Sequence, residues 1–187
     1  MRRVIPYSLA VFLGLAVGTA DPAHADQNDP RLVPLFTQLK RVTGYLQART
    51  IEQQIWAIWS ISSNAEVNRL MSDGVDAMTT QDFRTALADF TRVIEIAPDF
   101  AEGWNKRATV LWLVDDYEGS IADVDRTLAL EPRHFGALAG LGHIYAALDR
   151  DEEALVAYEK ALDVNPHMPG IIASIEQIKQ RLRDRQI

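Results

Sequence analysis

The sequence contains no cysteine among its 187 residues. The fold therefore does not depend on disulfide bonds, and no lipid can be attached through a cysteine. Long hydrophobic segments are scarce as well. The apolar run at residues 7–17 has about 11 residues, whereas a transmembrane helix needs roughly 20.

Sequence signatures of catalysis are also missing. The chain has no G-x-S-x-G, H-E-x-x-H or phosphate-loop motif. The neighbouring carboxylates Asp115 and Asp116 have no His, Cys or further carboxylate at a recognisable ligand spacing. We therefore predict that the protein is not an enzyme, has no catalytic residues, and uses neither a cofactor nor a metal ion.

The N-terminus has the organisation of a secretory signal. Arg2 and Arg3 precede the apolar run, and Ala23-His24-Ala25 places small residues at the two positions that a signal peptidase reads. We predict cleavage before Asp26 and a periplasmic location, so residues 1–25 are left out of the fold. The alternative is an uncleaved N-terminal anchor.

Basic residues are fewer than acidic ones. Cleavage removes Arg2, Arg3 and Asp21, which leaves 19 − 2 = 17 basic and 26 − 1 = 25 acidic side chains and a net charge of −8. Such an acidic surface argues against nucleic acid and against electrostatic binding to an anionic membrane.

One set of packing residues recurs every 34 residues. A large apolar residue, a small residue, a second small residue, a large residue and a closing proline appear in that order in each set. The three sets are Leu70, Gly74, Ala86, Phe90 and Pro98; Trp104, Ala108, Ser120, Val124 and Pro132; and Leu138, Gly142, Ala154, Tyr158 and Pro166. This period and pattern predict an array of helix-turn-helix repeats.

The residue types in these columns suit two packed helices. Small residues such as Gly142 and Ala154 let the paired helices approach closely, and enlarging either overpacks the contact. Pro166 ends the second helix because it has no N–H to donate and disfavours helical backbone in Asn165.

Residues 67–168 resemble three tetratricopeptide (TPR) repeats, at 67–100, 101–134 and 135–168. The resemblance implies an all-α, right-handed solenoid whose inner surface binds peptides or partner proteins, and it implies no catalytic residues. Two positions depart from the pattern, because Asp73 and Arg107 stand where a large apolar residue is usual.

The segments on either side of the repeats are predicted to cap the ends of the array. Residues 26–66 are predicted to form a short tail and a pair of capping helices stacked on the first repeat, and residues 169–187 a C-terminal capping helix. Trp56 and Trp59 lie on the apolar side of the second capping helix, where we interpret them as core residues. The alternative, an aromatic platform for a sugar, is less consistent with helical spacing.

Each repeat also carries an aspartate between its two helices. The segments are Gln81-Asp82-Phe83, Asp115-Asp116-Tyr117 and Arg150-Asp151-Glu152. A carboxylate at a helix N-terminus accepts bonds from unpaired N–H groups. We therefore predict that this aspartate caps the second helix of each repeat.

The resemblance to TPR repeats implies that the first helix of each repeat contributes to a binding groove. Its residues are Asn68, Met71, Val75 and Met78 from the first repeat, Asn105, Lys106, Thr109 and Trp112 from the second, and Ala139, His143 and Ala146 from the third. Methionine adapts to varied apolar partners, while Asn105 and Lys106 suit a peptide backbone or a carboxylate. The predicted partner is a protein or peptide, bound by an adaptor in the periplasm with a role in envelope assembly.

Several alternatives remain at this stage. A two-carboxylate clamp, known in some relatives, is disfavoured because Ala139, Gly140 and His143 stand where further cations are needed. His143 is either a pH sensor or a plain polar neighbour. The chain is otherwise a self-associating scaffold or a non-catalytic subunit of a periplasmic enzyme complex, and the sequence leaves its oligomeric state open.

Overall fold

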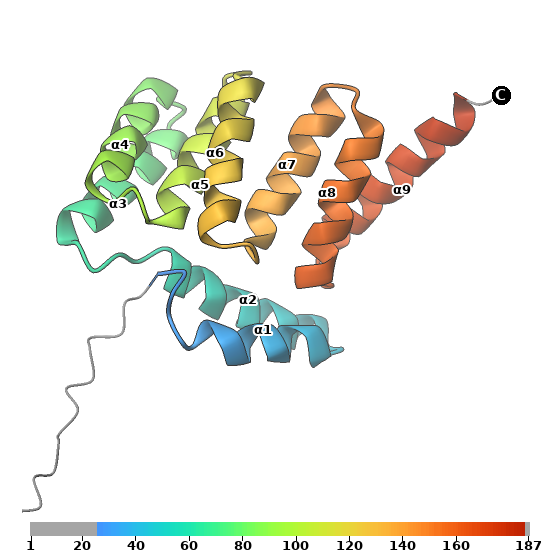
Figure 1. The fold of residues 1–187 in the computed structure, drawn as a ribbon, viewed down its shortest axis with the longest axis horizontal. Coiled ribbons are helices and arrows are strands. Elements are labelled where there is room, and N and C mark those ends of the chain that lie inside the picture. Colours follow the sequence, from blue (N-terminus) through green and yellow to red (C-terminus); the bar gives the residue numbers. More distant parts are fainter. Residues whose placement is uncertain (1–25, 186–187) are drawn as a thin grey trace, which may run out of the picture.

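The computed structural model describes residues 26–185, so the predicted signal at residues 1–25 lies outside the described part. Within that part the regular secondary structure is entirely helical (Figure 1). The helices are α1 Leu32–Arg41, α2 Tyr45–Trp59, α3 Ala65–Thr79, α4 Phe83–Ile96, α5 Ala101–Leu113, α6 Tyr117–Leu130, α7 Phe135–Ala147, α8 Asp151–Val164 and α9 Pro169–Asp184. None of these helices is both long enough and apolar enough to cross a membrane.

Three helix pairs form the predicted solenoid of repeats. The pairs α3–α4, α5–α6 and α7–α8 stand side by side in a row (Figure 1). The same turn joins the helices of each pair, because Gln81, Asp115 and Asp149 all adopt a left-handed backbone with φ of 62°, 60° and 57°. These residues are 34 apart, so the backbone repeats with the period of the sequence and confirms the prediction.

The predicted aspartate caps are present in two repeats out of three. Asp82 accepts a hydrogen bond from the Thr85 N–H at 3.1 Å, and Asp116 accepts one from the Gly119 N–H at 3.0 Å. In the third repeat the prediction is wrong, because the capping position is occupied by Arg150, whose side chain makes no capping bond. A step of 34 residues from Asp116 reaches Arg150, not Asp151.

Asp151 instead joins α8 to the C-terminal helix. Its buried carboxylate pairs with Arg181 and, at 3.1 Å, with Arg185. The hydrogen bond from Arg181 lowers the pKa of Asp151 despite the opposing effect of burial. Ile171, Ile175 and Ile178 are buried against α8, so α9 covers the exposed apolar side of the last repeat.

The small-residue column sets the distance between paired helices. A Cβ added to Gly74 would lie 2.7 Å from the Phe90 ring, and one added to Gly142 would overlap the Tyr158 ring. Each ring therefore occupies the space that a side chain at the glycine would need. Gly140, two residues away on α7, has no atom within 4 Å of an added Cβ.

Replacing Gly142 with Leu is expected to lower the free energy of unfolding by about 1 to 3 kcal/mol, because the new side chain overpacks against Tyr158. The matched control is Gly140→Leu, which makes the same gain in helix propensity, about 0.8 kcal/mol, without the overlap. Urea unfolding of both variants measures the difference. Equal stability of the two would contradict the packing of α7 on α8.

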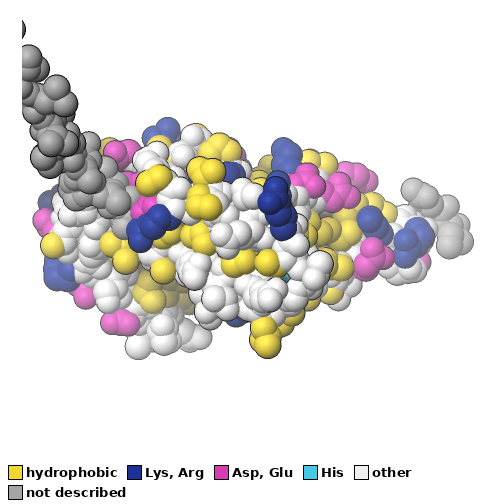
Figure 2. Space-filling view, turned by 90° about the horizontal axis from the view of Figure 1, so that it is seen from below, with side chains coloured by type: hydrophobic (Ala, Val, Ile, Leu, Met, Phe, Trp, Pro, Cys, Tyr) yellow, Lys and Arg dark blue, Asp and Glu magenta, His cyan; other side chains and the backbone are white. Residues whose placement is uncertain are grey.

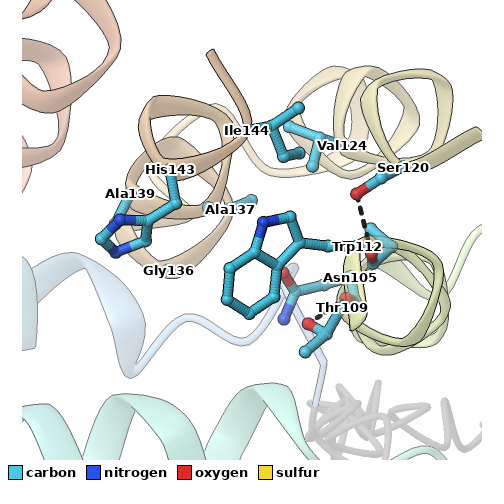
Figure 3. Close-up of a pocket in the computed structure, with 12 residues that line it drawn as sticks. Asn105, Thr109, Trp112, Ser120, Val124, Gly136, Ala137, Ala139, His143 and Ile144 are labelled. Atoms are coloured by element: carbon cyan, nitrogen blue, oxygen red, sulfur yellow. Dashed lines mark hydrogen bonds between the residues drawn. The ribbon is translucent and has the colours of Figure 1, made fainter. Parts of the chain in front are cut away.

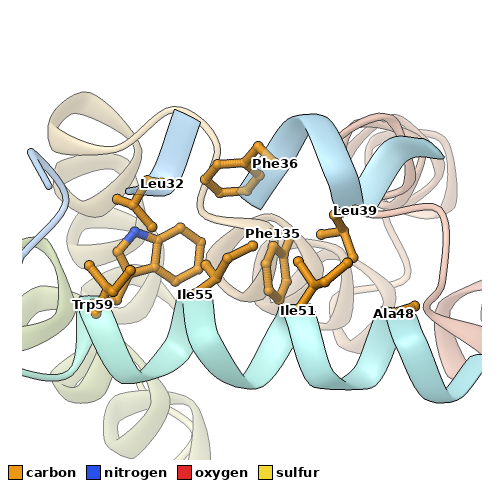
Figure 4. Packing of buried hydrophobic residues seen from close by; sticks show 9 residues of the cluster. Leu32, Phe36, Leu39, Ala48, Ile51, Ile55, Trp59 and Phe135 are labelled. Carbon is orange, nitrogen blue, oxygen red and sulfur yellow. The ribbon is translucent and has the colours of Figure 1, made fainter. Parts of the chain in front are cut away.

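The N-terminal helix pair, residues 27–59, differs in place from the predicted cap. It does not stack on the side of the first repeat but lies across the ends of several repeats (Figure 1). Its apolar side packs on Phe135 at the start of α7 (Figure 4), on Val164 at the end of α8 and on Met168 just before α9. Long-range contacts that no periodic pattern reveals determine this position.

Polar contacts tie the N-terminal helix pair to the turns between repeats. At the first turn, the Gln27 side chain donates to the Asp99 carbonyl and accepts from the Ala101 N–H at 3.2 Å. At the last turn, buried Asn165 donates to Glu52 at 2.8 Å. Of these three bonds, those from the Ala101 N–H and from Asn165 are buried, and losing a buried partner is costly.

Aromatic stacking joins α2 to the turn between α6 and α7. The Trp59 ring lies parallel to the His134 ring, with centroids 4.2 Å apart, and is only 1% exposed. Phe36 and Phe135 pack beside it (Figure 4). The interpretation of Trp59 as a core residue is therefore correct. Seen from below, the molecule shows hydrophobic side chains scattered among charged and uncharged ones (Figure 2). Leu46 on α2 is 79% exposed.

Candidate functional site

The first helices α3, α5 and α7 present one surface, which we call the groove, and two cavities hollow it. The cavity between α3 and α5 has a volume of about 390 Å³ and is lined by four predicted residues, Asn68, Met71, Val75 and Lys106. The cavity between α5 and α7 has a volume of about 230 Å³ and is lined by five more. These five are Asn105, Thr109, Trp112, Ala139 and His143 (Figure 3).

Two predicted groove residues line neither of these cavities. Met78 packs against the apolar cluster between α3 and α4. Ala146 packs against the cluster that joins α7, α8 and α9. Both sit near the C-terminal ends of their helices, where the side chain turns toward the neighbouring second helix.

The cavity between α5 and α7 owes its depth to small residues. Gly136, Ala139 and Gly140 line its α7 side. The side chain of Trp112, a residue that is 37% exposed, projects from α5 toward α7 (Figure 3). An apolar cavity of about 150 Å³ is large enough for benzene. A cavity of 230 Å³ therefore has room for one aromatic or large aliphatic side chain.

His143 lies at the rim of this cavity on a fixed support. Its Nδ1 is 2.7 Å from the hydroxyl of Tyr158, the same ring that packs on Gly142. Burial of the imidazole lowers the pKa of His143. The imidazole is thus neutral at pH 7 and shares one hydrogen bond with the Tyr158 hydroxyl.

Asn105 and Lys106 surround a buried carboxylate. The Glu102 side chain has no exposed surface, and its Oε2 accepts hydrogen bonds from Asn105 and His134, each at 2.9 Å. The Lys106 ammonium lies 3.1 Å from Oε1. His134 accepts a bond from the Ala137 N–H at Nδ1, so its proton is on Nε2 and points at Glu102.

The charge state of Glu102 follows from these neighbours. Burial raises the pKa of Glu102, but the Lys106 charge and the His134 hydrogen bond outweigh it, and the net shift is downward. The carboxylate is therefore ionised at neutral pH. Asn105 and Lys106 are thus part of the support of the groove, in addition to lining it.

A third cavity continues the groove beyond α7. It has a volume of about 540 Å³, lies between α2, α7 and α9, and shares Gly136 and His143 with the cavity between α5 and α7. Tyr45, Arg49 and partly exposed Trp56 line its α2 side. Sequence reasoning missed this part, because no local signal places α2 beside α7.

No group of three or more His, Cys, Asp or Glu side chains is arranged to bind a metal ion within residues 26–185. The groove instead offers amide, hydroxyl and indole groups around apolar hollows. Such a surface is suited to binding an extended chain by its backbone and side chains. Fold and groove together define a helical-repeat binding protein.

Comparison with known proteins identifies the family. Residues 136–168 match the tetratricopeptide repeat model. A TPR repeat-containing protein of Rhizobium etli is 38% identical over 136 residues, which cover 73% of this chain and 67% of the relative. The chain belongs to the tetratricopeptide repeat family. The small glutamine-rich TPR protein 2 of Saccharomyces cerevisiae is 28% identical over 102 residues, which span 54% of this chain but only 30% of that protein.

Solved structures share the fold at low sequence identity. The first TPR domain of Spaghetti (RPAP3), bound to the HSP90 peptide SRMEEVD, superposes with a TM-score of 0.61 at 20% identity and covers 63% of this chain and 94% of its own. The TPR2B domain of yeast Sti1, in complex with pHsp70, gives a TM-score of 0.60 at 21% identity, with coverages of 63% and 99%. Both share the helical architecture of this chain.

Proposed function

We propose that the protein is a non-enzymatic adaptor that binds an extended segment of a partner protein in its groove, in the periplasm and with a role in envelope assembly. The cavity between α5 and α7 carries this proposal, because its small wall residues leave room for one side chain of the bound segment. A structure of the same fold, the first TPR of Spaghetti, is bound to a peptide, which supports peptide binding by this fold.

The chemistry of the groove favours an internal segment with an apolar side chain. The two cations that line its cavities, Lys106 and Arg49, lie beside the buried carboxylates of Glu102 and Glu52. Their charge is largely compensated, so a terminal carboxylate gains little there. A two-carboxylate clamp is therefore not part of the proposal.

The periplasmic location rests on residues 1–25 of the sequence. N-terminal sequencing of the protein purified from cell fractions tests it directly. We expect the exported chain to begin at Asp26. A chain that retains residues 1–25 and sediments with membranes would contradict a cleaved signal.

Replacing Gly140 with Leu is expected to block partner binding without loss of fold. The added side chain extends into the cavity between α5 and α7, where it meets no atom at Cβ, and Leu is a better helix former than Gly. Asn105 and Lys106 are less suitable for this test, because replacing them disturbs buried Glu102. Crosslinking capture from a periplasmic extract compares the variant with the wild-type chain.

A specific protein captured by the wild type and lost with Gly140→Leu supports the groove. The control is Ala122→Leu on α6, an exposed position that lines none of the groove cavities. Equal capture by both variants would place binding elsewhere. Recovery of the chain alone, with a dimer mass in solution, would favour the alternative of a self-associating scaffold.

A further inference from the structure

On the side away from the groove, neighbouring repeats are separated by a second kind of cleft. Between repeats one and two, side chains of the protein itself fill this cleft. The guanidinium groups of Arg107 and Arg126 lie over the Trp104 ring, at 5.1 and 5.4 Å from its centre. Arg107 forms a double hydrogen bond with Asp123 at 2.7 and 2.8 Å. An indole and paired charges therefore close this space between repeats one and two.

The corresponding space between repeats two and three is open. Counting 34 residues on from Trp104, Arg107, Asp123 and Arg126 gives Leu138, Leu141, Ala157 and Lys160. The smaller side chains leave a cleft of about 430 Å³ between α6 and α8. Its apolar lining is Leu128, Leu138, Leu141, Tyr145, Val156 and Ala157.

The rim of the open cleft is acidic. Asp125, Glu152 and Glu153 line it against the single cation Lys160, so the lining has a net charge of 1 − 3 = −2. Arg150 pairs with Glu153 at 2.9 Å. Asp125 and Glu152 are exposed and form no ion pair with any residue in the range 26–185. Their charge is available to a ligand.

We propose that the cleft between α6 and α8 binds an aromatic side chain flanked by basic residues on a segment of a partner protein. The filled cleft shows what suits this geometry, since it contains an indole ring in contact with two guanidinium groups. The acidic rim selects basic neighbours by charge. This site is separate from the groove, because Leu138, Leu141 and Tyr145 lie on the other face of α7 from Ala139 and His143.

The test is an NMR titration of the mature chain with two tripeptides, acetyl-Arg-Trp-Arg-amide and acetyl-Glu-Trp-Glu-amide. We expect the basic peptide to shift the amide signals of Tyr145 and Val156 and to bind about tenfold more tightly than the acidic one. Asp125→Asn with Glu152→Gln, both at exposed positions, should reduce that preference to about twofold or less. Leu138→Trp, which restores the indole of the filled cleft, should remove the shifts.

Four outcomes would overturn the proposal. They are equal binding of the two peptides, shifts at Thr109 and His143 instead of the cleft, no shifts at millimolar peptide, and a dimer that Leu138→Trp dissociates, which would make a second copy the occupant. If Leu138→Trp does not fold, the Asp125→Asn and Glu152→Gln double variant tests the proposal by itself. Gly140→Leu, which fills the groove cavity, should leave this titration unchanged. A failure of the groove proposal can therefore be distinguished from a failure of the cleft proposal.

Discussion

Replacing Trp59 with Ala is expected to lower the free energy of unfolding by about 3 to 5 kcal/mol, the usual cost of removing a buried aromatic side chain. Trp59 is 1% exposed and stacks on His134 while packing on Phe36 and Phe135. The change removes the main contact between the N-terminal helix pair and the middle of the repeat row. Urea unfolding followed by circular dichroism measures the loss.

The matched control for this prediction is Trp112→Ala. Trp112 is 37% exposed and borders the groove cavity, so its removal loses less buried apolar area and should cost about 1 to 2 kcal/mol. Hydrogen exchange should also show faster exchange in α1 and α2 of Trp59→Ala, with α3 to α8 less affected. Equal costs for the two tryptophans would mean that the helix pair is not docked as described.

Replacing both Asn105 and Lys106 with Ala is expected to cost about 3 kcal/mol at pH 7. The change leaves the buried Glu102 carboxylate with only His134 as a side-chain partner, and breaking a buried ion pair on one side costs about 3 to 5 kcal/mol. We take the lower end because the Lys106 side chain is 28% exposed. Loss of partner binding in this variant would then result from disruption of the Glu102 network that supports the groove.

The pH dependence separates this charge effect from simple loss of packing. The pKa of Glu102 is below its ordinary value of 4.5, so its contribution to stability is present above pH 4.5 and declines as the pH falls through the folded-state pKa. The cost of the double substitution should therefore be larger at pH 7 than at pH 3.5. In a Glu102→Gln background the same double substitution should cost less at pH 7. A cost that is independent of pH and of Glu102 would contradict the network.

The sequence predicts the three repeats because their packing is local. Gly142 and Tyr158 are 16 positions apart, and the same contact recurs at Gly74 and Phe90. Each column therefore appears three times, and departures such as Arg107 do not hide the period. The groove residues follow from the same register, and most of them line the two cavities.

The remaining features depend on contacts that occur once. The position of the N-terminal helix pair rests on Glu52 with Asn165, 113 residues apart, and on Trp59 with His134. Neither pair has a periodic copy. The burial of Glu102 is equally hidden, since the repeats on either side carry Asn68 and Gly136 at that position. The contacts of Asn105 and Lys106 with buried Glu102 could therefore be identified only from the structure.

Site-specific photo-crosslinking in cells tests the central claim most directly. A photoreactive residue at Val75, which lines the groove cavity between α3 and α5 and is 40% exposed, is compared with one at Leu46, which is 79% exposed on α2. The account predicts a crosslink to one partner protein at Val75, absent at Leu46 and abolished by Gly140→Leu. A crosslink that forms equally at Leu46, or that persists in Gly140→Leu, would contradict binding in the groove.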